Sequence, residues 1–214
     1  MLRLLSLALI LMAVSTPAFC QQIKEFKNIE SFIGSLRNAS VRGSAEGDLM
    51  GRGRMDWAGI VASKEENDEE IVDIYILEKL GSGNYGLVEK SASRPAFGGT
   101  GNFGYEDITI QDKSVFVVFS YHWHSCAGNS TSQFKLTKNG WQLMGIESFE
   151  TNAVDGSGID INTSTNLLTS RAVIKKTNNG KSKVYRIKTA PKLLLLKNYS
   201  GEGTISIQEK TPIC

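Results

Sequence analysis

Apolar residues, many of them β-branched or aromatic, are concentrated in several short runs along the chain, and turn sequences separate these runs. The clearest runs are IVDIYILEKL (71–80), VFVVFSYHW (115–123), SQFKLTK (132–138) and WQLMGIESF (141–149). Short runs of this composition between turn sequences are typical of β-strands, and the alternation in SQFKLTK is typical of a strand that buries one face. The sequence therefore predicts a chain that is built mainly of strands.

Short turn sequences join neighbouring runs, so we expect consecutive strands to form antiparallel hairpins. Asn139-Gly140 separates two of the runs and favours a two-residue type I′ turn, because both residues tolerate a positive φ. QDKS (111–114) and NNGK (178–181) occupy equivalent places between other runs. This organisation favours an antiparallel meander, as a curled sheet or a sandwich, over a β-α-β arrangement.

One segment near the N-terminus has helical spacing instead. In NIESFIGSLRN (28–38), Ile29, Phe32 and Leu36 recur three or four residues apart, and Asn28 is suited to cap the N-terminus of a helix. We therefore predict a mainly β fold with one short N-terminal helix, in a single domain over residues 21–214.

The first 20 residues have the composition of a secretory signal peptide. A basic start is followed by an apolar run from Leu4 to about Val14 and then by small residues, and this run is too short for a membrane-spanning helix. Cleavage after Cys20 is expected to release a periplasmic or secreted protein, and lipidation at Cys20 is the alternative. No later run is long enough to predict a transmembrane helix.

Cleavage at that point would leave two cysteines, Cys126 and Cys214. An even number of cysteines in an exported chain favours a disulfide, which here would fasten residue 214 to a loop in the middle of the chain. A reactive thiol or a metal ligand at Cys126 is the alternative.

The loop GDLMGRGRMD (47–56) has the spacing of a calcium-binding loop. Asp48 and Asp56 occupy the first and last ligand positions of a D-x-[DN]-x-D-G-x-x-D pattern, and Gly53 occupies the sharp turn. A thioether is a poor ligand for calcium, and a guanidinium brings a positive charge into the site. Two positions that need oxygen ligands hold such side chains, Met50 and Arg52.

The residues of this loop predict ion pairs in place of the metal. Arg52 or Arg54 is expected to pair with Asp48 and Asp56 and so to hold the same turn without an ion. The loop is then a structural turn before the strand that begins near Trp57.

The same loop, followed by DWAGIV (56–61), resembles the GDLNGDG-like start of small exported bacterial proteins of unassigned function. That start is itself similar to the calcium loops of FG-GAP, integrin-type repeats. Three later stretches also resemble this group: YEDITIQDKSVFV (105–117), TSQFKLTKNGWQLMGIE (131–147) and INTSTNLLTS (161–170). The resemblance implies a fold type and export, and it implies no mechanism because the group has no assigned activity.

A second candidate for metal binding is YHWHSC (121–126). Residues two apart on a strand share a face, so His122, His124 and Cys126 would project together as ligands for zinc or copper. The alternative is a pair of surface histidines beside the disulfide of Cys126. We predict no cofactor for this chain.

The sequence lacks the motifs of common hydrolases. It contains no G-x-S-x-G motif, and the Gly-rich FGGTGNFG (97–104) does not open a predicted helix, which argues against a phosphate site. The paired carboxylates of a glycan-cleaving enzyme are a spatial arrangement that a sequence does not exclude. We therefore predict that the protein is not an enzyme, with a glycan- or cell-wall-associated enzyme as an alternative.

Positive charge is concentrated near the C-terminal end. The formal net charge is only +2, but residues 171–197 contain nine Lys or Arg and no Asp or Glu. Nucleic acid is not expected as a ligand, because a single aromatic residue lies among these charges. The lysines could protect a sheet edge from pairing, or the stretch could bind an acidic partner, an anionic envelope polymer or a membrane surface. The predicted partner-binding side chains are Lys175, Lys176, Lys183, Tyr185, Arg186 and Lys188.

These features together predict an exported, non-enzymatic binding module. We expect a periplasmic inhibitor or immunity-type protein that docks a partner protein in the envelope through a basic face. A metal-binding envelope protein that uses His122 and His124 is the main alternative.

Overall fold

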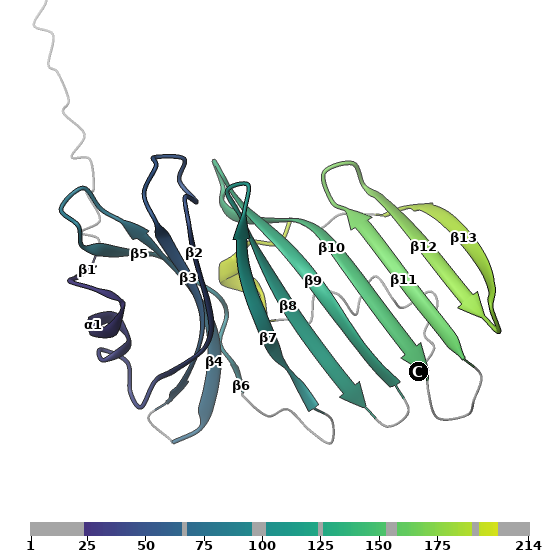
Figure 1. Ribbon diagram of the computed structural model, residues 1–214, viewed down its shortest axis with the longest axis horizontal. Helices are drawn as coiled ribbons and strands as arrows, with labels where there is room; N and C mark the ends of the chain where they lie inside the picture. Colours follow the sequence, from purple (N-terminus) through teal and green to yellow (C-terminus); the bar gives the residue numbers. More distant parts are fainter. Residues whose placement is uncertain are drawn as a thin grey trace, which may run out of the picture.

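The computed structural model describes residues 24–65, 68–95, 102–123, 126–152, 158–189 and 193–200. Within them the chain forms two antiparallel sheets, one short α-helix and one 3₁₀ helix, η1 (Leu196–Asn198) (Figure 1). The predicted mainly β fold with one short N-terminal helix is confirmed. The predicted signal peptide, residues 1–20, lies outside the described residues.

The first sheet, sheet A, contains the N-terminal strands. They are β1 (Glu25–Phe26), β2 (Ser40–Gly47), β3 (Asp56–Lys64), β4 (Glu70–Lys79), β5 (Tyr85–Lys90) and β6 (Arg94–Pro95). Their order is β1-β5-β4-β3-β2, and β6 pairs with the start of β4. Both faces of β3 and β4 are buried, which explains why these two strands are apolar at most positions rather than at every second one.

The helix α1 (Ile29–Ile33) covers one face of sheet A. The Asn28 side chain accepts a hydrogen bond from the Ser31 N–H at 2.9 Å, and the Ser31 hydroxyl accepts one from the Asn28 N–H at 3.1 Å, so the predicted cap is present. Phe32 is buried and packs edge-on against Tyr75, with 5.1 Å between ring centroids. The described part of the chain contains no helix of the length and apolar character needed to cross a membrane.

The second sheet, sheet B, is a meander in which each strand pairs with the next one along the chain. Its strands are β7 (Asn102–Gln111), β8 (Ser114–Trp123), β9 (Cys126–Thr137), β10 (Gly140–Asn152), β11 (Ile159–Asn166), β12 (Arg171–Asn178) and β13 (Lys181–Lys188). Strand β7 lies beside β2 of sheet A, and from there sheet B extends to β13 at the opposite end of the molecule (Figure 1).

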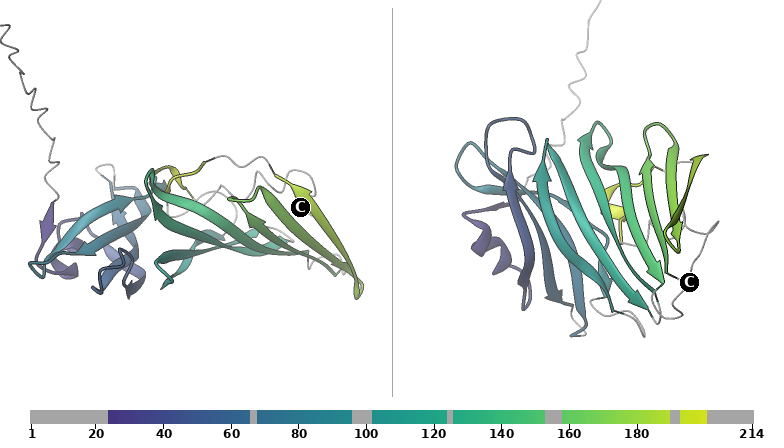
Figure 2. Two further views of the ribbon diagram at one scale, coloured as in Figure 1. Left: turned by 90° about the horizontal axis from the view of Figure 1, so that it is seen from above. Right: turned by 45° about the vertical axis from the view of Figure 1, so that its right-hand side comes forward.

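The two faces of sheet B differ in what covers them. The inner face carries buried apolar residues such as Val117, Phe134 and Trp141, which belong to one core with Ile60 and Ile74 of sheet A. We call the opposite face of sheet B, which points away from this core, the outer face. Sheet B continues beyond sheet A, as the view from above shows (Figure 2), and β13 is exposed at seven of its eight positions. The far end of sheet B is therefore available for contacts.

The hairpin predicted at Asn139-Gly140 is present, but the predicted turn type is wrong. Strand β10 begins at Gly140, so Lys138 and Asn139 are the turn residues, and of these three residues only Gly140 has a positive φ, +104°. A type I′ turn needs a positive φ at both turn residues. Asp112 and Lys113, between β7 and β8, satisfy this condition with φ values of 49° and 58°.

Candidate functional site

Asp48 organises the first half of the calcium-like loop, residues 47–56. Its Oδ1 accepts the Arg52 N–H and its Oδ2 accepts the Gly53 N–H, both at 2.8 Å. These hydrogen bonds, mainly the one from Gly53, lower the pKa of Asp48. Gly53 has a φ of +68°, which explains the glycine at this turn. The carboxylate that would bind calcium is therefore bonded to N–H groups of its own loop.

Asp56 closes the loop from the buried side. It is 0% exposed, and its Oδ2 accepts the N–H groups of Leu49 and Met50, each at 3.0 Å. Its Oδ1 accepts the N–H of Lys79, at the end of β4, at 2.8 Å. One carboxylate thus satisfies three backbone donors from two segments of the chain, and it attaches the loop to sheet A.

The predicted ion pairs between the arginines of the loop and these aspartates are wrong. Arg52 pairs through Nη2 with Glu78 Oε2 on β4 at 2.5 Å, and the guanidinium of Arg54 lies beside the β4–β5 turn. The cation that acts on Asp48 is Lys113, from the β7–β8 turn. Sequence reasoning missed these partners because they belong to strands and turns that are distant along the chain.

Calcium is expected to leave the stability of the protein unchanged. Met50 supplies no oxygen ligand and Arg52 brings a positive charge to the loop, so the ligand set for calcium is incomplete. The melting temperature in about 5 mM calcium, which exceeds the dissociation constants of weak extracellular sites, should equal that in EDTA. The control Asp48→Asn should lower the melting temperature equally in both buffers. A rise with calcium and not with magnesium would contradict this account.

Two of the three candidate metal ligands, His122 and Cys126, lie on different strands. Strand β8, which carries His122, ends at Trp123, and β9 begins at Cys126. His122 is exposed, on the outer face of β8.

Within the described residues, no group of three or more His, Cys, Asp or Glu side chains could hold a metal ion. His124 lies outside these residues, and so does Cys214 with the predicted disulfide to Cys126. Metal binding by His122 and His124 and the disulfide therefore stay predictions.

The six residues predicted to bind a partner lie on β12 and β13, but they do not share a face. Residues that are directly opposite each other in an antiparallel pair point to the same side of a sheet. By register, the outer face carries three of the six, namely Lys175, Arg186 and Lys188. The inner side carries the other three, Lys176, Lys183 and Tyr185. The prediction of a single basic face was wrong because side chains alternate along each strand.

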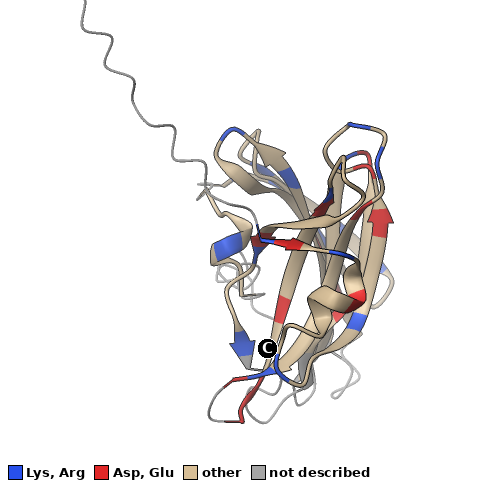
Figure 3. Ribbon diagram, turned by 90° about the vertical axis from the view of Figure 1, so that its left-hand side faces the viewer, with Lys and Arg blue, Asp and Glu red and all other residues tan. Residues whose placement is uncertain are grey.

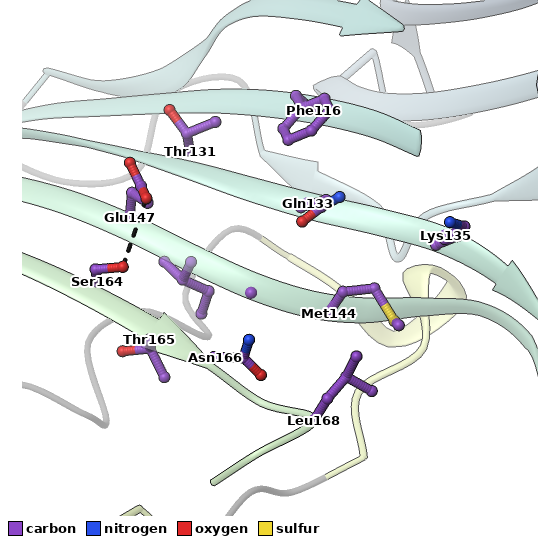
Figure 4. A pocket seen from close by; sticks show the side chains of 12 residues that line it. Phe116, Thr131, Gln133, Lys135, Met144, Glu147, Ser164, Thr165, Asn166 and Leu168 are labelled. Atoms are coloured by element: carbon purple, nitrogen blue, oxygen red, sulfur yellow. Dashed lines mark hydrogen bonds between the residues drawn. The ribbon is translucent and has the colours of Figure 1, made fainter. Parts of the chain in front are cut away.

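A groove with a volume of about 570 Å³ lies on the outer face, across β8 to β11 (Figure 4). The polar side chains that line it are Thr131, Gln133, Lys135, Glu147, Ser164 and Asn166. The apolar side chains that line it are Phe116, Met144 and Leu168. The groove can therefore bind a ligand through hydrogen bonds and apolar contacts together. No sequence motif indicated it, because its lining comes from four neighbouring strands and the loop after β11.

A β-bulge in β10 shapes the groove. The register between β9 and β10 shifts between Leu143 and Gly145, which leaves Met144 as the extra residue. Leu143 and Ile146 are both buried in the core as a result, whereas Met144 lines the groove. A Cβ at Gly145 would lie 3.0 Å from the Thr165 carbonyl oxygen, so glycine permits the close approach of β10 and β11 at this point.

Cross-strand rows connect the groove with cations on the last two strands. Read from β10 to β13, one row of directly opposed residues is Glu147, Ser164, Val173 and Arg186. Read from β11 to β13, the next row is Asn166, Arg171 and Lys188. The groove therefore continues into a basic surface without a break. We call this combined surface the groove–hairpin face; it consists of the groove lining and of Arg171, Lys175, Arg186 and Lys188.

The groove–hairpin face carries an excess of positive charge. Its cations are Lys135, Arg171, Lys175, Arg186 and Lys188, and the described residues offer none of them an ion-pair partner. The carboxylates on the outer side of the same strands are Glu147 and Asp160. At the end of the molecule formed by sheet A, by contrast, acidic and basic positions are interspersed (Figure 3). The groove–hairpin face therefore differs from the sheet A end of the molecule, because most of its charged side chains are positive.

Sequence reasoning also missed a buried acid on the inner face. Glu150 is buried and hydrogen-bonded to Tyr121, and burial raises the pKa of both groups. Gly128 lies between them in the register, and a Cβ there would lie 2.6 Å from the Tyr121 hydroxyl. The absence of a side chain at Gly128 lets the Tyr121 ring reach across β9. This pair links three strands of sheet B.

Comparison of the chain with protein-family profiles, curated proteins and solved structures finds no match. The resemblance to exported proteins with a degenerate FG-GAP-type loop therefore stays a prediction. Function has to be argued from the surfaces that the fold creates.

Proposed function

We propose that this protein is a non-enzymatic binding module that docks an acidic partner protein through the groove–hairpin face. The observation that carries the proposal is the continuity of the groove with the cations of β12 and β13 along shared cross-strand rows. Positive surfaces attract and orient negatively charged partners. The module would act in the periplasm or outside the cell, as an inhibitor or immunity-type protein.

Exposed apolar side chains on the same face favour a polypeptide over a small anion. Val173, Val184 and Leu168 are 40%, 50% and 64% exposed, and they lie among the cations. Protein interfaces combine an apolar centre with a polar or charged rim. A surface that carries both kinds of group matches a partner segment with acidic and apolar side chains.

The groove supplies contacts that charge alone does not provide. Gln133 and Asn166 carry amide groups, which offer donors and an acceptor each, and Phe116 and Met144 provide apolar surface beside them (Figure 4). In the proposed complex the groove receives partner groups at the centre of the interface, and the cations of β12 and β13 lie toward its rim.

Reversing the outer-face cations should weaken docking about 30-fold, since each exposed charge pair contributes up to roughly 1 kcal/mol. The outer-face variant combines K175E, R186E and K188E. A matched control reverses three exposed cations at the sheet A end of the molecule, through K24E, K27E and K64E. The control should bind within about threefold of the unmodified protein, because its charges lie away from β12 and β13.

The measurement uses the tagged chain to retain proteins from an envelope extract, followed by titration calorimetry with the purified partner. Raising the salt concentration should weaken binding by the unmodified protein and by the sheet A control. Equal affinities of the two triple variants would show that the partner does not use the groove–hairpin face.

A further inference from the structure

We infer that β13 accepts an extended acidic segment of the partner as an additional strand of sheet B. The inference rests on the proposed function, because the segment belongs to the protein that docks on the groove–hairpin face. It adds the mode of binding, in which main-chain hydrogen bonds at a sheet edge provide affinity and side-chain charges select the segment.

Strand β13 is an open edge of sheet B. It pairs with β12 along all eight of its residues, and no other strand in the described ranges pairs with it. Of the eight residues of β13, seven are exposed and Ile187 is partly buried. Figure 1 shows β13 at the end of the sheet that is farthest from sheet A. An uncovered edge of this length presents a row of backbone groups to which another strand can bond.

The register identifies which backbone groups of β13 are available. The Thr189 N–H donates to the Ser170 carbonyl at 3.0 Å, so this pair is a hydrogen-bonded pair of the β12–β13 ladder. Hydrogen-bonded and non-hydrogen-bonded pairs alternate in an antiparallel ladder. The β13 residues that bond to β12 are therefore Lys181, Lys183, Tyr185 and Ile187. The residues whose N–H and C=O groups point away from β12 are Ser182, Val184, Arg186 and Lys188.

The outward backbone groups belong to the residues whose side chains lie on the outer face. An added strand would therefore meet the free N–H and C=O groups of Arg186 and Lys188 beside their charges. Acidic residues opposite these two cations and an apolar residue opposite Val184 would form favourable cross-strand pairs. On the inner side, an acidic residue would face Lys183 and an apolar one would face Tyr185.

A second copy of this chain is not the expected occupant. Each β13 carries four cations and no carboxylate, so pairing two β13 strands would bring eight positive charges together without a counter-charge. Charges of one sign on an edge strand oppose its pairing with another copy. The same cations of β13 that oppose pairing with a second copy favour pairing with an acidic strand. One set of residues therefore both protects the sheet edge from self-association and selects an acidic partner.

The spacing of the four β13 cations is the same in both directions along the strand. They occupy its first, third, sixth and eighth positions, so one peptide pattern, E-x-E-x-x-E-x-E, matches both parallel and antiparallel addition. The probe peptide has valine or threonine at the x positions. Its matched control has the same composition with all glutamates together at one end. Simple charge attraction would bind both alike, whereas strand addition should favour the patterned peptide about tenfold.

Amide hydrogen exchange in the unmodified full chain detects the added strand directly. The patterned peptide should slow exchange at the amides of Val184, Arg186 and Lys188, which point outward. The control peptide at the same concentration should leave their exchange unchanged.

A proline variant removes one outward donor and leaves every charge in place. Val184→Pro should weaken binding of the patterned peptide about tenfold, whereas Val184→Thr, which keeps the N–H, should bind nearly as the unmodified protein does. Continued protection of the Tyr185 and Ile187 amides shows that β13 still pairs with β12 in the variant.

Equal binding of the two peptides, or unchanged exchange at the three outward amides, overturns strand addition. If the outer-face triple variant still loses the partner in that case, the proposed function stands and only this mode of binding is refuted. Selective binding of the patterned peptide with slowed exchange at those amides supports the inference.

Discussion

Replacing Asp56 by alanine is expected to destabilise the folded protein by about 4 kcal/mol. The carboxylate is 0% exposed and accepts the N–H groups of Leu49, Met50 and Lys79. Its removal leaves three backbone donors without their acceptor, and each unsatisfied buried donor costs about 1–3 kcal/mol. The expected loss is below the sum of these costs, because the loop can relax and admit water. The calcium-like loop should then detach from the end of β4.

Urea denaturation followed by circular dichroism measures this change in the free energy of unfolding. Asp48→Ala is the matched control, because Asp48 also accepts two N–H groups of the same loop but lies at its exposed end, where water can replace it. A smaller loss is expected there. Asp56→Asn should recover part of the stability, since its amide has one acceptor oxygen. Equal losses for the two alanine variants would mean that burial of Asp56 is not the cause.

Replacing Gly59 by alanine is expected to destabilise the protein by about 3 kcal/mol. Gly59 lies on β3 beneath the indole ring of Trp57, and a Cβ at this position would overlap the ring. Trp57 is 3% exposed and packs against Phe32 of α1. A closely packed cluster offers the ring no alternative position, so the added methyl group displaces neighbouring side chains. The attachment of α1 to sheet A should weaken as a result.

Gly43→Ala is the matched control for this substitution. Gly43 lies on the neighbouring strand β2, where a Cβ would find its nearest atom, Ile60 Cδ1, at 3.7 Å, an ordinary contact. This variant should change the free energy of unfolding by less than about 1 kcal/mol in the same urea experiment. Combining Gly59→Ala with Trp57→Phe should restore part of the loss, because the smaller ring leaves space. A fully stable Gly59→Ala variant would contradict the packing of Trp57.

Stability and proposed binding depend on different parts of the molecule. Asp56 and Gly59 act within sheet A, whereas the cations of β12 and β13 lie at the far end of sheet B (Figure 2). Charge reversal on β13 is therefore expected to change binding with little effect on the melting temperature. This separation allows the docking experiments to be interpreted without a contribution from unfolding.

The sequence predicted the strands, the hairpins and the helix cap because these features depend on residues close together in the chain. The alternation around Phe134 indicated β9, and Asn28 indicated the start of α1. The prediction for Asn139-Gly140 located the hairpin but not its turn type, since Gly140 belongs to β10 instead of the turn. Local patterns thus locate elements better than they define backbone geometry within them.

Side-chain partners were much harder to predict than strands. The arginines of the loop at residues 47–56 were matched with its aspartates because all of them are near one another in sequence, yet Arg52 pairs with Glu78 on β4. The carboxylates of the loop were already satisfied by backbone N–H groups. Backbone donors carry no mark in a sequence, so reasoning from side chains alone overlooks them.

By itself, the sequence determined a mainly β chain with a capped N-terminal helix and a basic segment near its end, because alternation, capping and composition are local properties. Only the tertiary structure decided that Arg186 and Lys188 share a face with the groove while Lys183 does not. Only the tertiary structure likewise placed three backbone donors around Asp56. The register of strands far apart in the chain sets these contacts, and no local pattern encodes that register.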